Sequence, residues 1–262
     1  METEEKLQKA RIKIDKIDQV LVKSFQERMK LVEEVIEFKK QNRLPIFHGQ
    51  REKEIIHRAL GSLTDKDFAK EVEDFLRGIF KISRGYQARK LFSTNIALIG
   101  FMGTGKSTVG RRLSQELGID YVDTDDLIEK RLAMPISAIF EKHGENFFRD
   151  MERQVIKEVS SLKNRIIICG GGVVLDRENV KKLRENARVL LLEAQAESIY
   201  QRIKSNDGRP LLKGQMGVRR IKELLKSRQT AYEAAAHIKI DTDKKTLDEI
   251  SSEIINELYT MD

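Results

Sequence analysis

The sequence lacks several features that define large classes of proteins. Its 262 residues include a single cysteine, Cys169, which excludes an internal disulfide and indicates a reducing compartment. Cys169 ends an apolar run at 166–169, so we expect a buried, inert thiol rather than a nucleophile. No apolar run reaches the roughly 18 residues of a membrane-spanning helix, and the first residues are acidic where a signal peptide is basic. We therefore expect a cytoplasmic protein without a membrane partner.

Aromatic residues are also scarce, and their scarcity bears on possible partners. They make up 6% of the chain, while the net charge is +7. A nucleic-acid-binding surface usually concentrates basic residues and interleaves them with aromatics, whereas here both charge signs alternate along predicted helices. That alternation is typical of a solvated surface. We expect no nucleic-acid partner. We expect part of the excess positive charge to bind small anionic substrates.

The chain is longer than one typical domain, and its pattern changes near residue 92. Residues 7–90 contain almost no helix breakers and carry apolar side chains at three- and four-residue spacings, which predicts three helices. We expect the first to end at 42–45, where a proline stops it, the second to cover about 50–60, and the third to begin at 64–67. The first helix, roughly 35 residues long, needs a partner for its apolar stripe, and we expect a homodimer.

From residue 95 onward, short apolar runs alternate with amphipathic helical segments. This alternation predicts an α/β domain built on a parallel sheet. The sequence therefore predicts two domains, an all-α three-helix domain at 1–91 and an α/β domain at 92–262. The expected strands are 96–99, 121–122, 166–169, 189–192 and 237–240.

A phosphate-binding loop follows the first of these runs. Residues 100–107 read Gly-Phe-Met-Gly-Thr-Gly-Lys-Ser, a full match to G-x-x-x-x-G-K-[ST], with an apolar run before it and a helical pattern after it. Glycines let the backbone fold around phosphate oxygens, and the first helical N–H groups point at the anion. Lys106 is expected to reach the β- and γ-phosphates of ATP, and the Ser107 hydroxyl to ligate Mg²⁺. The predicted nucleotide-binding residues of the loop are Gly103, Thr104, Gly105, Lys106, Ser107 and Thr108.

Carboxylates follow the second predicted strand. Asp123 and Asp125 stand where phosphoryl transfer needs an anion to hold Mg²⁺ and a base for the attacking hydroxyl. An N-cap role accounts for the neighbouring Asp126 but accounts poorly for Asp123. We therefore expect Asp123 to help hold the metal ion and Asp125 to act on the substrate.

Further along the chain, three features fit the same site. Arg149 and Glu152 lie at i, i+3 on one helix face, where the glutamate can hold the guanidinium for a substrate carboxylate. Three glycines at 170–172 let bare backbone approach a ligand. Arg209, after a polar stretch, is typical of a lid that seeks phosphate, and Arg228 comes one helix later. Each arginine taken alone is also compatible with a surface role.

Together these residues resemble the shikimate kinase family over about 95–257, through the ordered motifs GFMGTGKST, DTD, FFRxxE, GGG, RPLL and RxxxY. The resemblance implies transfer of phosphate from ATP to shikimate, with Mg²⁺ bound near Asp123 through water. Asp125 would contact the shikimate hydroxyls as base or orienter. Arg209 would close over the phosphates, and Arg202 would pack near the adenine. The implied shikimate-binding residues are Asp125, Arg149, Gly171, Gly172 and Arg228.

Another small-molecule kinase that shares the phosphate loop is the alternative. A nucleoside monophosphate kinase should carry base-reading residues, and the sequence offers no candidates for them. Assays on shikimate, gluconate and nucleoside monophosphates separate these cases.

Two cations interrupt the apolar stripe of the first predicted helix. Arg28 and Lys39 are eleven residues apart, which places them within roughly 20° of the same direction on a helix. Cations on a face that otherwise looks buried need an anionic partner, unless their stems snorkel to solvent. Ser83 and Gln87 likewise share one face of the third helix.

Through the ordered motifs RxKIDxID, ER, FK, P-x-x-x-x-x-RE and SxxxQ, this half resembles the all-helical chorismate mutase family over about residues 7–90. The resemblance implies rearrangement of chorismate to prephenate, by holding a dianion compact and stabilising charge on the breaking ether oxygen. It also implies an intertwined dimer in which the partner supplies the arginine at the Arg11 position. By this resemblance, Arg11 and Arg28 bind the substrate carboxylates, and Ser83 assists them. Lys39 and Gln87 contact the ether oxygen. Glu52 contacts the substrate hydroxyl with help from Lys39, and Arg51 supports the pocket.

His48 departs from the family pattern, which often has aspartate there. Histidine could donate a hydrogen bond to the substrate or be a loop residue, so the mutase activity could be weak or pH-dependent. A non-catalytic helical module that dimerises the chain or senses pathway ligands is the competing hypothesis.

Overall fold

The structure, a computed structural model, describes residues 2–204 and 217–261. Its described part forms two compact units, Met1–Leu44 and Pro45–Asp262, and each is described by itself. The first unit consists of one long helix, α1 (Glu2–Asn42). It ends where the sequence predicts, just before Pro45, and Arg43 adopts a positive φ of 50° at its end. The domain boundary expected near residue 92 stays a prediction.

The second unit begins with two further helices, as the periodicity predicts. They are α2 (Gly49–Gly61) and α3 (Ala69–Leu91), and a short 3₁₀ turn, η1 (Lys66–Phe68), precedes α3. The third helix therefore begins later than expected, because Asp65 caps η1 by accepting from the Asp67 N–H at 3.0 Å. His48 is the N-cap of α2, with Nδ1 accepting from the Arg51 N–H at 3.2 Å.

The predicted parallel sheet is confirmed. Its five strands run in the order β2-β3-β1-β4-β5, and every neighbouring pair is parallel. This order places the ends of β1, β2 and β3 side by side, where the phosphate loop, the aspartates and the glycines follow. The strands are β1 (Asn95–Ile99), β2 (Tyr121–Asp123), β3 (Ile166–Ile168), β4 (Ala187–Glu193) and β5 (Ile238–Asp241).

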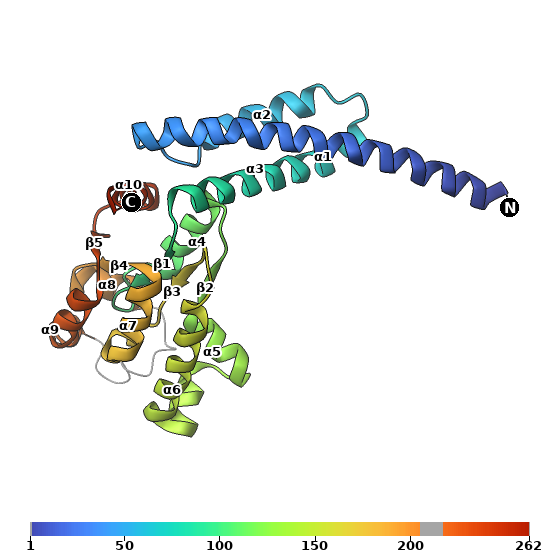
Figure 1. Cartoon of the computed structure of the whole chain (residues 1–262). Helices are drawn as coiled ribbons and strands as arrows, with labels where there is room; N and C mark the ends of the chain where they lie inside the picture. Colours follow the sequence, from blue (N-terminus) through green and yellow to red (C-terminus); the bar gives the residue numbers. More distant parts are fainter. Residues whose placement is uncertain (1, 205–216, 262) are drawn as a thin grey trace. The chain divides into compact units, whose positions relative to one another are not determined.

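Helices cover both faces of this sheet, as Figure 1 shows for the unit. Strand side chains alternate between the two faces of the sheet. On one face, Ala97 and Ile99 join an apolar cluster with helices α6, α7 and α9. On the opposite face, α4 packs on β1 and β3. The helices are α4 (Lys106–Leu117), α5 (Thr124–Leu132), α6 (Ile136–Ser160), α7 (Arg177–Asn186), α8 (Ala196–Ile203), α9 (Val218–Ala235) and α10 (Leu247–Met261), with a 3₁₀ turn η2 (Val173–Leu175).

Helix α3 packs directly against α4, the helix that follows the phosphate loop. The contact depends on two glycines. A Cβ atom added to Gly85 would lie 2.6 Å from the carbonyl oxygen of Gly118, the left-handed C-cap of α4. An ion pair between Lys81 and Asp120 at 3.2 Å flanks the contact. Close backbone approach at this point explains why α3 belongs to the same compact unit as the sheet.

This contact predicts a strong dependence on the size of residue 85. Gly85→Ala forces the α3 and α4 backbones apart and is expected to destabilise the protein by about 1–3 kcal/mol, the usual cost of overpacking. Gly78→Ala is the matched control on the same helix, because a Cβ there meets no described atom within 4 Å. It is expected to stabilise by about 1 kcal/mol through helix propensity. Thermal unfolding measures both changes, and equal Tm values for the two variants would contradict the packing argument.

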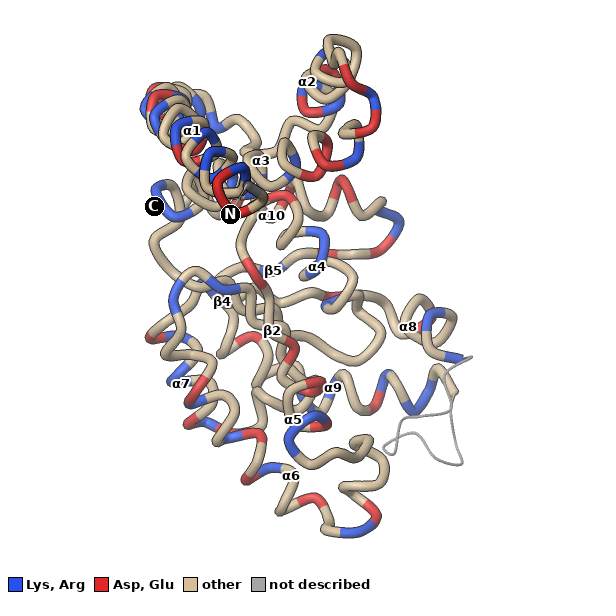
Figure 2. The backbone as a smooth tube through the Cα atoms, turned by 90° about the vertical axis from the view of Figure 1, so that its right-hand side faces the viewer, with Lys and Arg blue, Asp and Glu red and all other residues tan. Residues whose placement is uncertain are grey.

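Charges of both signs are interspersed along the helices of the chain. Figure 2 shows blue and red segments alternating along α6 and α7, in agreement with the alternation read from the sequence. Among the described residues, no helix combines the length and apolar character needed to cross a membrane.

Candidate active site

The phosphate loop connects β1 to α4 through glycines with positive φ. Gly103 has a φ of 79°, and Gly105, the N-cap of α4, has a φ of 94°, values that side chains with a Cβ rarely adopt. The Lys106 ammonium donates to the carbonyl oxygens of Gly100 at 2.8 Å and Phe101 at 2.9 Å. The lysine is thus held at the loop, where a bound phosphate would lie at the N-terminus of α4.

Asp123 joins the loop to the second strand. Its Oδ2 accepts from the Ser107 hydroxyl at 3.1 Å, and its Oδ1 accepts from the Asp125 N–H at 3.1 Å. Asp123 is therefore the N-cap of α5, and Asp126 lies in the first turn. The expectation that capping explains Asp126 rather than Asp123 was wrong, because the carboxylate that ends a strand is also placed to cap the helix that follows at once.

Asp125 has the electrostatic environment of a proton acceptor. Desolvation by the surrounding protein raises its pKa to about 7, the Asp123 carboxylate adds to the rise, and the Lys106 ammonium opposes it. A carboxyl group with this pKa is divided between its two protonation states near neutral pH. This balance suits a group that must receive a proton during a reaction.

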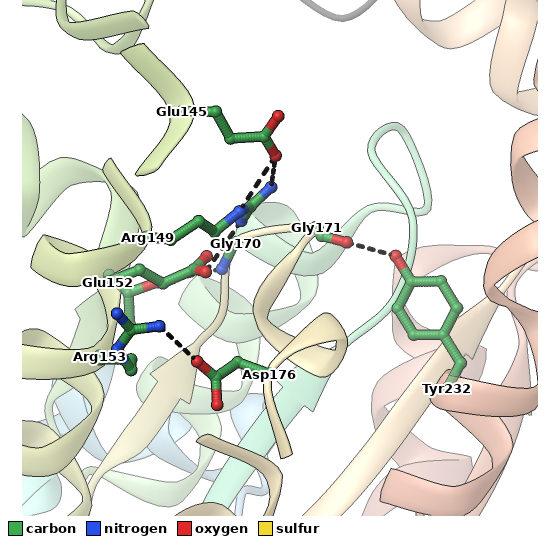
Figure 3. Close-up of polar contacts among 9 residues, drawn as sticks. Glu145, Arg149, Glu152, Arg153, Gly170, Gly171, Asp176 and Tyr232 are labelled. Atoms are coloured by element: carbon green, nitrogen blue, oxygen red, sulfur yellow. Dashed lines mark hydrogen bonds and ion pairs between the residues drawn. The ribbon is translucent and has the colours of Figure 1, made fainter. Parts of the chain in front are cut away.

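Helix α6 supplies an arginine that two glutamates hold. Arg149 donates to Glu152 at 2.8 Å and to Glu145 at 3.0 Å, as Figure 3 shows. Glu152 is buried, and desolvation raises its pKa although the Arg149 charge opposes the rise. The Arg149 guanidinium lies directly against Gly172, where a Cβ atom would collide with it. The predicted Arg149–Glu152 pairing is therefore present, next to the triple-glycine loop.

One cavity of about 520 Å³ brings most of the predicted residues together. Its lining includes the phosphate loop, both strand-end aspartates, Arg149, the glycine loop and two arginines from α8 and α9. The predicted residues that line it are Gly103, Gly105, Lys106, Ser107, Thr108, Asp123, Asp125, Arg149, Gly171, Gly172, Arg202 and Arg228.

Hydrogen bonds fix several of the predicted residues, and not all of them line the cavity. Thr104 turns its hydroxyl inward to donate to Phe101 O at 2.8 Å. Arg202 donates to Gly103 O at 3.3 Å and to Thr242 O at 2.9 Å, which holds it beside the phosphate loop. Arg209 lies outside the described residues. Cys169 is buried, as expected, and desolvation raises the pKa of its thiol.

The residues of the mutase resemblance fall in both compact units. Arg11, Arg28 and Lys39 belong to α1. In the second unit, α2 carries Arg51 and Glu52, and α3 carries Ser83 and Gln87, which are buried one turn apart.

Glu52 has a partner that the motif does not reveal. Its carboxylate forms an ion pair with Arg84 of α3, and the Arg84 guanidinium also lies over the Phe47 ring, 5.2 Å from the centroid. Arg112 of α4 approaches the same ring, at 5.9 Å. A pairing between residues on different helices leaves no local signal in the sequence.

The cavity also has an apolar wall that the sequence analysis did not identify as functional. Ile136, Phe140 and Phe148 of α6 line it, and the two phenylalanine rings pack at a tilt of 37° with centroids 4.8 Å apart. From the sequence, the spacing of these side chains indicates only the buried face of an amphipathic helix. Of the three, only Phe148 could have been assigned to the site from the sequence, because it directly precedes Arg149.

The fold and the cavity together define a kinase of the phosphate-loop class. Parallel strands carry the loop after β1 and carboxylates after β2, so phosphate-binding and proton-accepting groups face one cavity at the carboxyl end of the sheet.

Comparisons with known proteins narrow this class. The sequence model of the family described as shikimate kinase matches residues 102–259, and that of chorismate mutase type II matches residues 10–88. The shikimate kinase of Thermodesulfovibrio yellowstonii is 46% identical over 163 residues, which cover 62% of this chain and 94% of that enzyme. That of Caldanaerobacter subterraneus subsp. tengcongensis is 44% identical over 161 residues, with the same coverage.

Solved structures agree with the sequence matches. The shikimate kinase from Acinetobacter baumannii, solved in complex with shikimate, aligns with a TM-score of 0.65 and 33% identity, covering 68% of this chain and 98% of that one. The chain therefore belongs to the shikimate kinase family. It carries a chorismate mutase type II domain ahead of the kinase domain, which confirms the predicted fusion.

Proposed function

We propose that the chain catalyses two reactions of aromatic amino-acid biosynthesis. Its α/β domain transfers the γ-phosphate of ATP to shikimate, giving ADP and shikimate 3-phosphate. Its helical domain rearranges chorismate to prephenate. The observation that carries the kinase proposal is the single cavity that joins the Lys106 ammonium, the Asp125 carboxyl group and the Arg149 guanidinium.

In the kinase reaction, the chain's residues hold two anions and accept one proton. Arg149, Arg228 and the Gly171–Gly172 backbone hold the shikimate carboxylate and hydroxyls, while the phosphate loop and Lys106 bind the triphosphate. A shikimate hydroxyl oxygen bonds to the γ-phosphorus as the bond to the β-phosphate bridging oxygen breaks. Its proton passes to Asp125 Oδ, and Lys106 balances the charge that gathers on the phosphate oxygens.

The residues at the phosphate loop also fit a magnesium ion. Ser107 and Asp123 present adjacent hard oxygen atoms, and Mg²⁺ commonly binds one or two such protein ligands together with phosphate oxygens and water. Desolvation and the nearby Asp126 charge raise the pKa of Asp123, so a cation beside it would be favourable. When bound, the ion supplies positive charge to the β- and γ-phosphates.

ADP release with purified protein tests the kinase proposal. Turnover is expected with shikimate and not with gluconate or nucleoside monophosphates. Absence of turnover with shikimate, in a sample that is folded by circular dichroism, would refute the assignment and leave another small-molecule kinase as the alternative.

The pKa of Asp125 predicts how the kinase responds to pH. Only the ionised carboxyl group accepts the proton, so kcat/KM for shikimate is expected to rise with pH, with a midpoint near the pKa of about 7. Bound Mg²⁺ shifts the midpoint down by favouring the carboxylate. Profiles at saturating ATP over pH 5.5–9 measure it. A flat profile across this range would contradict a proton-accepting role for Asp125.

The mutase proposal assigns charge complementarity to the helical domain. Arg11 and Arg28 bind the chorismate carboxylates, and Ser83 assists them. Lys39 and Gln87 donate to the ether oxygen. Glu52 holds the substrate hydroxyl with help from Lys39, and Arg51 supports the pocket. His48, as the cap of α2, supplies structure at the position of the family's aspartate. Loss of chorismate absorbance tests turnover. Binding without turnover would favour the competing function, a ligand-sensing module.

We also propose that the protein is a homodimer through α1. The proposal is supported by large apolar side chains along this helix that are 44–64% exposed, since exposed apolar surface of this extent marks interaction sites. They include Leu7, Ile14, Ile17, Leu21, Val35 and Phe38. Sedimentation equilibrium is expected to give twice the chain mass of 30.3 kDa.

A further inference from the structure

Two backbone donors of the triple-glycine loop have no partner in the part of the chain that the structure describes. Gly170 donates to the Thr124 hydroxyl at 3.0 Å, and its carbonyl accepts from the Val173 N–H at 3.2 Å. The Gly172 carbonyl accepts from the Leu175 N–H at 3.0 Å. Within the described residues, the N–H groups of Gly171 and Gly172 have no such partner. Both residues line the cavity beside Arg149, so these N–H groups are the ones available to a ligand.

The Gly171 carbonyl, the remaining polar group of the loop, accepts a hydrogen bond from a helix distant in the sequence. The Tyr232 hydroxyl on α9 donates to the Gly171 carbonyl oxygen at 2.5 Å, as Figure 3 shows. The Tyr232 side chain is 3% exposed and belongs to the apolar cluster under the loop. Its ring is therefore fixed by packing. Its hydroxyl donates to the Gly171 carbonyl oxygen and also has the Arg228 side chain as a hydrogen-bond partner.

This hydrogen bond controls the direction of a neighbouring donor. A trans peptide unit is planar, so the Gly171 carbonyl and the Gly172 N–H point in opposite directions within one rigid plane. Glycine residues on both sides of that plane resist its rotation little. We propose that Tyr232 is a positioning residue: by holding the Gly171 carbonyl, it turns the Gly172 N–H toward the bound carboxylated substrate. The inference rests on the proposed kinase function.

The protonation state of Tyr232 is compatible with this role across a wide pH range. Desolvation raises the pKa of its hydroxyl to about 12, although the nearby Arg228 charge opposes the rise. The hydroxyl therefore remains a donor wherever the enzyme is assayed. On the other side of the loop, Arg153 of α6 donates to Asp176 at 2.9 Å, so the segment that follows the glycines is also held.

Tyr232→Phe tests the proposal because it keeps the ring and removes only the hydroxyl. KM for shikimate is expected to rise about 3- to 10-fold, the usual effect of one lost neutral hydrogen bond, while KM for ATP changes less than twofold. Tyr121→Phe is the control, since this tyrosine lies on edge strand β2 outside the cavity lining. Mutase turnover and Tm report whether the variant is folded.

The possible outcomes separate the two proposals. A selective rise in KM for shikimate with Tm close to wild type supports the positioning role. Unchanged constants in Tyr232→Phe, or equal losses for both substrates together with a lower Tm, would overturn it while leaving the kinase assignment intact. A wild-type protein that releases no ADP with shikimate would overturn both.

Discussion

Asp125→Asn is expected to lower kcat for shikimate phosphorylation by about 10²- to 10⁴-fold, the range supplied by a positioned proton acceptor. Asparagine has nearly the same shape but cannot take a proton from the attacking hydroxyl. The pH dependence predicted for the wild-type enzyme should disappear from the residual activity. Mutase turnover of the same chain is the internal control and should not change.

The same substitution is expected to raise stability while it removes activity. The pKa of Asp125 is about 7 in the folded protein against 3.8 for the ordinary group, so its stabilising contribution is present at low pH and is lost as the pH rises toward 7. At pH 8 without Mg²⁺, the wild type therefore holds an unfavourable buried charge that asparagine lacks. Tm of Asp125→Asn should equal or exceed that of wild type. A variant with more than a tenth of wild-type kcat would show that Asp125 only binds substrate.

Local sequence patterns predicted the fold and the centre of the kinase site. Each strand is a short apolar run, and the phosphate loop is a contiguous string whose chemistry depends on neighbours in sequence. Parallel strands then bring Ser107 and Asp123 together, although sixteen positions separate them. The sequence analysis placed both residues near one metal ion without predicting this direct hydrogen bond.

Contacts between distant elements could not be predicted in the same way. Tyr232 and Gly171 meet only because α9 packs under the loop, and the sequence contains no spacing that signals it. The same is true of the Arg84–Glu52 ion pair and of the close approach of Gly85 to Gly118. In each case the partners are set by tertiary packing, which the periodicity of a single helix does not determine.

Capping residues show a second limit. Asp123, Asp65 and His48 all cap helices, and each was open to a different interpretation from the sequence. Side chains that favour caps also favour catalytic and metal sites, because both uses need an oxygen or nitrogen acceptor near backbone N–H groups. Asp123 caps α5 with one carboxylate oxygen and accepts from the Ser107 hydroxyl with the other.

For the helical domain, Lys39→Ala is expected to lower mutase kcat by about 10²- to 10³-fold, the usual cost of one donor that stabilises developing negative charge. In the rearrangement, negative charge builds on the ether oxygen as its bond to carbon breaks, and the Lys39 ammonium is the proposed donor. Alanine leaves that charge without its cation. Kinase turnover of the same sample should stay at the wild-type level.

Lys40→Ala is the matched control, because it removes an equal charge from the adjacent position in the last turn of α1. A lysine at either position stabilises the helix through its interaction with the helix dipole. Any loss that arises from charge or helix stability should affect both variants, whereas loss of the ether-oxygen contact affects Lys39→Ala alone. Equal mutase activity in the two variants would exclude Lys39 from catalysis. A wild-type chain that binds chorismate without turning it over would instead identify the helical domain as a sensor attached to an active kinase.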